Sequence, residues 1–147
     1  MNKWDKRFID MAHLVATWSK DPSTKVGAVL AEGNRVISVG FNGFPRGTDD
    51  SPELYENRER KYKRVLHAEQ NAIAFAQRKL EWCTIYITHA PCSRCVAQII
   101  QEGIKRIVCP NPWADNDYME RWRLDVLETE AMCREAKVKL EYVDGNR

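Results

Sequence analysis

One short stretch, Pro91-Cys92-Ser93-Arg94-Cys95, holds the two cysteines that lie closest together in the chain. It stands at the predicted start of a helix that ends at Gly103 and has one apolar face, formed by Val96, Ile99 and Ile100. Because positions i and i+3 share a helix face, both sulfurs can reach one ion. Free amides and the dipole at a helix start also favour the thiolate that binds metals. Alone, the motif is equally compatible with a redox pair or structural thiols.

A second stretch, His67-Ala68-Glu69, also opens a predicted helix and offers a third ligand. One histidine and two cysteines make three protein ligands. Catalytic zinc usually has three and keeps a position for water, whereas structural zinc is usually closed by four. Unless His13 or His89 completes the set, the count favours an open zinc site.

Glu69 has a chemical role if the metal is there. Beside an activated water, its carboxylate can take up a proton and deliver it to the substrate and leaving group. Residues two apart point in nearly opposite directions on an ideal helix. The prediction therefore requires His67 to lie at the first helical position or just before it.

The elements predicted around these motifs alternate between helix and strand after an initial hairpin. In chain order they are a helix over 3–19, strands over 26–31 and 35–41, a helix over 67–80, a strand over 83–88, the helix after Pro91, a strand over 104–109, a helix over 118–136 and a strand over 138–143. This order predicts an α/β fold in which helices cover one sheet. The charged segment 49–64 is the candidate insertion.

Composition narrows the classes of function. The 147 residues are predicted to form a single domain, 1–147, and 23 basic against 21 acidic residues give a net charge of +2. That balance provides no general electrostatic basis for binding nucleic acid. The five cysteines are an odd number without an export signal, which argues against a disulfide framework. With no apolar run long enough to cross a membrane, the predicted location is the cytoplasm.

The pairing of His-Ala-Glu with Pro-Cys-x-x-Cys is the signature of zinc nucleobase deaminases. The chain closely resembles the cytidine and deoxycytidylate deaminase superfamily, and within it the deoxycytidylate (dCMP) deaminases. The resemblance extends to residues 19–28 (SKDPSTKVGA), 40–47 (GFNGFPRG) and 103–108 (GIKRIV). It implies a three-layer α-β-α fold with one central, mixed, five-stranded sheet.

The resemblance also implies an activity, the hydrolytic deamination of dCMP to dUMP, which supplies pyrimidine deoxynucleotides for dTMP synthesis. His67, Cys92 and Cys95 match the zinc ligands, and Glu69 matches the proton carrier. By the same matching, the Ala68 amide and Thr24 contact the pyrimidine or its sugar, the Ala90 carbonyl receives the exocyclic amine, and Asn42 holds the deoxyribose hydroxyl. A homo-oligomer, a hexamer in larger relatives, is implied, with dCTP and dTTP as effectors and magnesium as a companion of such an effector.

Several residues have plainer interpretations. Asn42 suits a turn, and Thr24 can face solvent. Cys83, Cys109 and Cys133 read as buried thiols. The basic run 58–64 reads as a solvated face, although one of its cations can approach a 5′-phosphate, and His89 can line the base pocket. The tryptophans, among them Trp122, read as packing or subunit-contact residues.

Two other functions remain open at this stage. One is a deaminase of a different substrate, such as a modified cytosine nucleotide, dCTP, a cytidine nucleoside or a tRNA adenosine. The other is a zinc-stabilised binding module without turnover.

Overall fold

One mixed sheet of five strands forms the centre of the structure, a computed structural model that describes residues 1–144. The strands are β1 (Gly27–Glu32), β2 (Arg35–Phe41), β3 (Thr84–Ile87), β4 (Arg106–Pro110) and β5 (Lys139–Val143). Their spatial order is β2-β1-β3-β4-β5. β1 is antiparallel to both β2 and β3, whereas β3, β4 and β5 are parallel. The predicted mixed five-stranded sheet is confirmed.

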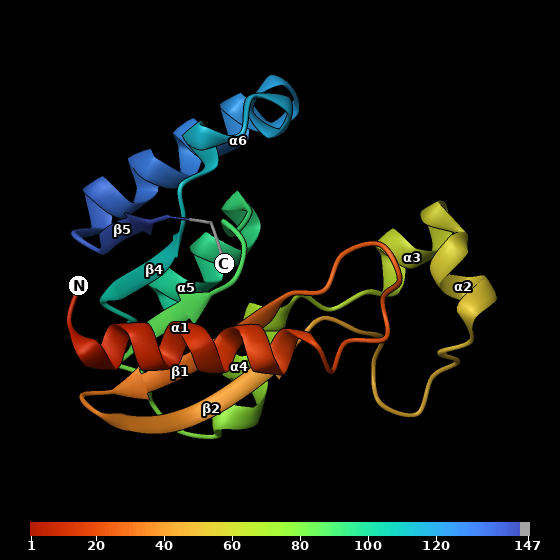
Figure 1. The fold of residues 1–147 in the computed structure, drawn as a ribbon, viewed down its shortest axis with the longest axis horizontal. Coiled ribbons are helices and arrows are strands. Elements are labelled where there is room, and N and C mark those ends of the chain that lie inside the picture. The colour runs from red at the N-terminus through yellow and green to blue at the C-terminus, as the bar shows by residue number, and fades with distance from the viewer. Residues whose placement is uncertain (145–147) are drawn as a thin grey trace.

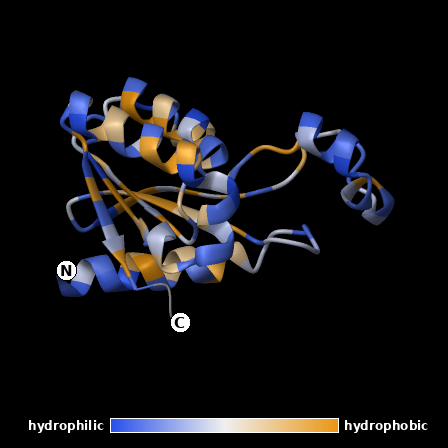
Figure 2. Ribbon diagram, turned by 90° about the horizontal axis from the view of Figure 1, so that it is seen from above, coloured by the Kyte–Doolittle hydropathy of each residue, from blue (hydrophilic) through white to orange (hydrophobic). Residues whose placement is uncertain are grey.

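Helices cover both faces of this sheet, which gives the predicted three layers (Figure 1). α1 (Lys3–Ala16) lies on one face, with its apolar side against β1, β3 and β4. The opposite face carries α4 (Ala68–Ala76), α5 (Ser93–Gln101) and α6 (Asn116–Ala136) over the larger of two apolar clusters. Figure 2 shows the hydrophobic residues gathered between the layers. A short 3₁₀ helix, η1 (Pro112–Ala114), precedes α6.

Two glycines allow helices on opposite faces to approach the sheet closely. A Cβ atom at Gly27 would come within 2.0 Å of the Ala12 carbonyl oxygen of α1. A Cβ at Gly40 would come within 2.4 Å of the Ala72 amide nitrogen of α4. Since backbone cannot give way as a flexible side chain can, both positions require glycine. The close packing of α4 against the sheet fixes the position of the N-terminus of α4.

The candidate insertion forms two short helices, α2 (Pro52–Glu56) and α3 (Arg58–Arg64). We call residues 52–64 the arm. Pro52 stands in the first turn of α2, where its missing N–H costs no helical hydrogen bond. The Asn57 side chain accepts from the Arg60 amide and caps α3. The arm projects from the three layers and is largely hydrophilic (Figures 1 and 2).

Element boundaries differ from prediction mainly in the middle helix. It was expected to run to residue 80 but ends at Ala76, because Gln77 adopts a left-handed backbone with φ of 52°. Within residues 1–144, no helix is long and apolar enough to cross a membrane.

Candidate active site

Three strand ends meet at one edge of the sheet and create the site. β1 begins there at Gly27, next to the end of β2 at Phe41 and the end of β3 at Ile87. Thr88, directly after β3, links β3 to the start of β1. Its amide donates to the Gly27 carbonyl (3.0 Å), and its hydroxyl accepts from the Gly27 amide (3.0 Å). α4 and α5 begin at the same edge. In α/β sheets, ligand sites form outside the carboxyl ends of strands.

His67 occupies the N-cap position of α4, immediately before the first helical residue. Its backbone is extended (φ −77°, ψ 158°), and its amide donates to the Gln70 side chain at 2.8 Å. The helical periodicity therefore begins after His67, which meets the geometric condition that the sequence set. His67 and Glu69 can both face one site.

Cys92 is likewise the N-cap residue of α5, and Cys95 lies in its first turn. His67 Nδ1 is 3.1 Å from Cys95 Sγ and 3.8 Å from Cys92 Sγ, and the three ligand atoms lie within 4.8 Å of one another. Tetrahedral zinc with ordinary Zn–S and Zn–N bonds would separate such atoms by roughly 3.5–3.8 Å. The donor set therefore fits zinc. In the described chain, neither His13 nor His89 joins this group, so three protein ligands are provided.

Hydrogen bonds among these ligands shift the pKa of each of them. Hydrogen bonds from the Cys95 thiol and from His67 lower the pKa of Cys92 to about 4, against the opposing effect of burial. The pKa of Cys95 is raised, because its proton is shared with Cys92 and because it is buried. Hydrogen bonding to Cys92 raises the pKa of His67. The surroundings therefore favour the thiolate form of Cys92, the form that metals bind.

The Glu69 carboxyl is buried beside these ligands, with only 4% of the residue exposed. Burial raises its pKa, and a hydrogen bond with Cys95 opposes part of that rise. No lysine or arginine in residues 1–144 forms an ion pair with it. A buried carboxyl with a raised pKa can both hold and release a proton near neutral pH.

The start of α5 is fixed by a carboxylate from another helix. Asp125 of α6 accepts from the Ser93 amide (2.9 Å) and the Ser93 hydroxyl (2.5 Å). Ser93 lies between the two cysteines in sequence. This contact therefore orients the metal-binding turn from outside, as outer partners of metal ligands commonly do.

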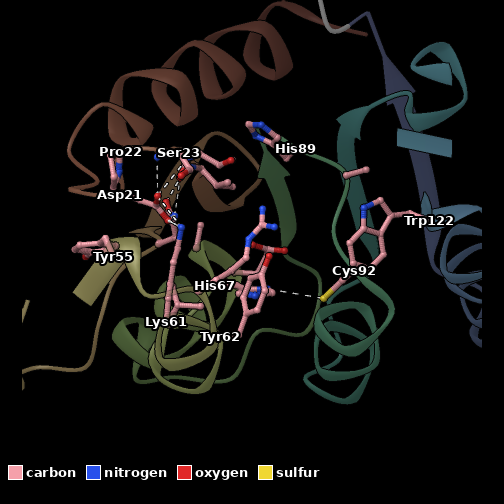
Figure 3. A pocket seen from close by; sticks show the side chains of 18 of the residues that line it. Asp21, Pro22, Ser23, Tyr55, Lys61, Tyr62, His67, His89, Cys92 and Trp122 are labelled. Atoms are coloured by element: carbon pink, nitrogen blue, oxygen red, sulfur yellow. Dashed lines mark hydrogen bonds and ion pairs between the residues drawn. The ribbon is translucent and has the colours of Figure 1, made fainter. Parts of the chain in front are cut away.

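A pocket of about 670 Å³ opens onto His67, Glu69 and Cys92 (Figure 3). Thr24, Asn42, Ala68 and Ala90, the four expected substrate contacts, all line it. Cys95 is not part of the lining and is buried. The structure thus brings every predicted site residue to one place, and the volume suits a small ligand.

The Asn42 side chain is already engaged in local structure. Its Oδ1 accepts from the Val26 amide (2.9 Å), and its Nδ2 donates to the Thr24 carbonyl (2.9 Å) and to Asp21 (3.3 Å). Both amide hydrogens are therefore used. A substrate hydroxyl could only donate to the second lone pair of Oδ1. The turn role foreseen for Asn42 is present, and its contact with a sugar stays a prediction.

Sequence reasoning missed several residues of the pocket. Tyr118 and Trp122 of α6 line it, although Trp122 had been interpreted as a packing or subunit-contact residue. Arg58 and Lys61 of the basic run also line the pocket, and so does His89, as the sequence allowed for both. No local signal pointed to Tyr118 and Trp122, because only the packing of α6 against α5 brings them to the site.

The fold and this donor set define a zinc hydrolase of the nucleobase-deaminase class. The family described as "Cytidine and deoxycytidylate deaminase zinc-binding region" matches residues 2–110. An uncharacterized deaminase in the luxG 3′ region of Aliivibrio fischeri is 49% identical over 143 residues, which cover 97% of this chain and 95% of the relative. The chain therefore belongs to the cytidine and deoxycytidylate deaminase family, whose members are zinc-binding hydrolases.

Relatives with a named substrate are more distant. The deoxycytidylate deaminase of Mus musculus is 37% identical over 113 residues, which cover 72% of this chain but 64% of the mouse protein. Among solved structures, the dCMP deaminase of cyanophage S-TIM5 in apo form matches with a TM-score of 0.70 and 24% identity, over 97% of this chain and 100% of the phage chain. At that identity the phage structure supports the fold. Tyr118 and Trp122 lie beyond the residues that the family match covers.

Proposed function

We propose that this protein deaminates dCMP hydrolytically, giving dUMP and ammonia. The observation that carries the proposal is the His67–Cys92–Cys95 group beside a buried, unpaired Glu69 at the wall of a nucleotide-sized pocket. Zinc held by these three residues supplies an activated water at neutral pH. In the balanced reaction, water adds at C4 of cytosine, the C4–N bond breaks and a C4 carbonyl remains.

Glu69 is the proton carrier in this proposal. Its carboxylate accepts a proton from the attacking water and passes protons to N3 of the ring and to the departing amine. Burial without a cation partner keeps the carboxyl able to exist in both protonation states. Its position in the first turn of α4, two residues after the N-cap His67, supports this role.

The backbone around the metal ligands holds the base. The Ala68 amide lies at the start of α4, where helical amides lack intrahelical partners. In this proposal the Ala90 carbonyl, two residues before Cys92, accepts a hydrogen bond from the exocyclic amine; that Ala90 lines the pocket supports this role. Thr24 and Asn42 approach from the start of β1 and the end of β2, and they contact the sugar.

A nucleotide rather than a nucleoside is favoured by Arg58. This residue lines the pocket from the arm, and in the described part of the chain its guanidinium has no ion-pair partner. An unpaired guanidinium at the wall of a pocket is suited to a phosphate group. The named deoxycytidylate deaminase of the mouse supports the same substrate.

A homo-oligomer, with the hexamer as the expected form, and a magnesium-bound nucleotide effector stay predictions from family resemblance. The oligomer can be tested by analytical ultracentrifugation with and without dCTP.

The substrate is tested by a deamination panel on zinc-loaded protein. We expect kcat/KM for dCMP to exceed that for deoxycytidine, CMP, dCTP, 5-methyl-dCMP and a tRNA anticodon stem. Turnover confined to tRNA or to nucleosides would contradict the proposal. Tight zinc binding without turnover of any member of the panel would instead indicate a binding module.

A further inference from the structure

A buried ion pair in the pocket wall connects two segments that are far apart in sequence. Lys61 of the arm lies with its Nζ 2.8 Å from Oδ2 and 2.9 Å from Oδ1 of Asp21 (Figure 3). The side chains are 13% and 3% exposed, respectively. Most exposed ion pairs contribute little, but a buried pair that loses one partner leaves an uncompensated charge. Both residues line the pocket.

Asp21 also organises the loop that carries an expected substrate contact. Its carboxylate accepts from the Ser23 amide (2.9 Å), from the Thr24 amide (3.4 Å) and from Asn42 Nδ2 (3.3 Å). Asn42 in turn binds the Thr24 carbonyl. The position of Thr24 therefore depends on Asp21, and Lys61 is the cation that compensates the Asp21 charge.

The arm has few other attachments to the rest of the molecule. Among the described elements, α2 and α3 contact each other and no other helix or strand. At the base of the arm, Gly43 and Leu66 form an isolated β-bridge, and the Phe44 and Tyr55 rings stack at 4.2 Å between centroids. Five arm residues nevertheless line the pocket, namely Tyr55, Glu56, Arg58, Lys61 and Tyr62.

We propose that Lys61 is a positioning residue: through its ion pair with Asp21 it fastens the arm to the loop 21–24 and so sets the shape of the substrate pocket. Lys61 does not serve as the phosphate ligand, because its ammonium group already lies against both Asp21 oxygens. Arg58, three residues earlier on α3, remains for the phosphate. The identity of the substrate in this proposal rests on the proposed function.

The two roles predict different selectivities. A residue that binds the phosphate matters for dCMP and not for deoxycytidine, which lacks that group. A residue that holds the arm and the loop in place matters for both, because the base and sugar contacts shift together. A misplacement of about 1 Å can cost about 100-fold in rate.

The test compares Lys61→Met with Lys63→Met. Lys63 lies on the same helix and pairs with Glu59, but both side chains of this pair are largely exposed. Lys63→Met is therefore a matched loss of one cation. We expect Lys61→Met to lower kcat/KM for both deoxycytidine and dCMP by about 10- to 100-fold, mainly through KM and with zinc content unchanged, and the loss for dCMP is at least as large because Arg58 lies on the same helix. Lys61→Arg should restore most of the loss, and Lys63→Met should behave as wild type.

Hydrogen exchange of the arm provides a readout that needs no substrate. Amides of α3 and of Ser23 and Thr24 should exchange faster in Lys61→Met but not in Lys63→Met. Lys61→Met alone leaves the buried Asp21 carboxylate without its cation, which can destabilise the fold. The double variant Asp21→Asn/Lys61→Met removes both charges and so avoids this effect. It should fold and still show the raised KM.

Three results would overturn the positioning role: exchange and KM of Lys61→Met equal to wild type, a loss confined to dCMP, or a wild-type KM in the double variant. Failure of the proposed function would look different. Wild-type protein would then turn over no cytosine nucleotide, while the exchange experiment would still report on the Lys61–Asp21 attachment.

Discussion

Two buried carboxyl groups at opposite ends of the sheet have opposite surroundings. Asp5 of α1 is 2% exposed and lies beside the start of β4, where the Arg106 guanidinium meets both of its oxygens at 2.8 and 2.9 Å. Tyr86 donates a further hydrogen bond at 2.6 Å. Glu69 is 4% exposed near the end of β3 and has a cysteine and a histidine as neighbours instead of an arginine.

The difference separates a structural carboxylate from a chemical one. Hydrogen bonds from Arg106 hold the pKa of Asp5 far below its usual range, so Asp5 stays ionised and joins α1 to the sheet. Burial without such a partner raises the pKa of Glu69. A carboxyl group fixed in one charge state can hold a fold together, whereas one poised between two states can carry protons.

Glu69→Gln should cause the largest change and should affect activity without loss of the fold. We expect kcat for dCMP to fall by about 10²- to 10⁴-fold, the usual contribution of a positioned acid–base group. The melting temperature of the metal-free protein should not fall, because an unpaired buried carboxyl is replaced by a neutral amide. Steady-state kinetics and calorimetry measure the two effects. A large drop in melting temperature would mean that Glu69 is a structural residue like Asp5.

Asp5→Asn should give the converse result. Loss of the carboxylate leaves Arg106 with the Glu141 carboxylate as its remaining partner in the described chain, so we expect the free energy of unfolding to fall by about 3 kcal/mol, the lower end of the range for a broken buried pair. The kcat of the folded protein should stay near that of wild type. Urea titration measures the loss, and Glu59→Gln, which removes an exposed partner of Lys63, should shift stability by less than about 0.5 kcal/mol.

Acid should remove the contribution of Asp5. Its pKa in the folded protein lies below the unfolded value of about 3.9. The stabilisation is therefore complete above that value and is lost as pH falls through the folded pKa. The melting temperatures of wild type and Asp5→Asn should differ clearly at pH 6 and approach each other progressively as the pH falls below about 4. A gap that stays constant into acid would show that Asp5 stabilises by packing rather than by charge.

Asp125→Asn should produce a smaller effect, confined to the metal end of the sheet. Asparagine keeps one acceptor for Ser93 but loses the charge, so the turn with Cys92 is held less firmly. We expect zinc affinity to weaken by about 10-fold, the lower limit for partners that orient metal ligands. Competition with a chromophoric chelator measures this. Unchanged affinity would mean that the Ser93 contact only caps α5.

Cys133→Ala should produce the smallest effect on the site. Cys133 is a buried free thiol on the apolar side of α6, outside the ligand group. Zinc stoichiometry should remain one per chain, measured by elemental analysis, as also expected for Cys109→Ala. A reduced zinc content in either variant would show that the ligand set is incomplete.

The site near the metal could be predicted because its residues carry local signals. Two motifs at predicted helix starts identified His67, Glu69, Cys92 and Cys95 as candidate site residues. The alternation of helices and strands predicted a sheet covered by helices. That residues 1–147 form one domain stays a prediction.

What could not be predicted depends on contacts between distant segments. Lys61 and Asp21 are 40 residues apart, Arg106 and Asp5 are 101 apart, and Ser93 and Asp125 are 32 apart. In the sequence, each charged member of these pairs looks like an ordinary surface residue. The arm was expected only as a candidate insertion, and its two helices were not located, because a dense run of charges hides the cap at Asn57.

Zinc titration of metal-free protein, with dCMP deamination as the readout, tests the central claim most directly. For wild type, activity should rise linearly and level off at one zinc per chain, while Glu69→Gln should bind the same zinc and stay nearly inactive. Full activity before zinc is added, or equal activity of Glu69→Gln across the titration, would contradict the account.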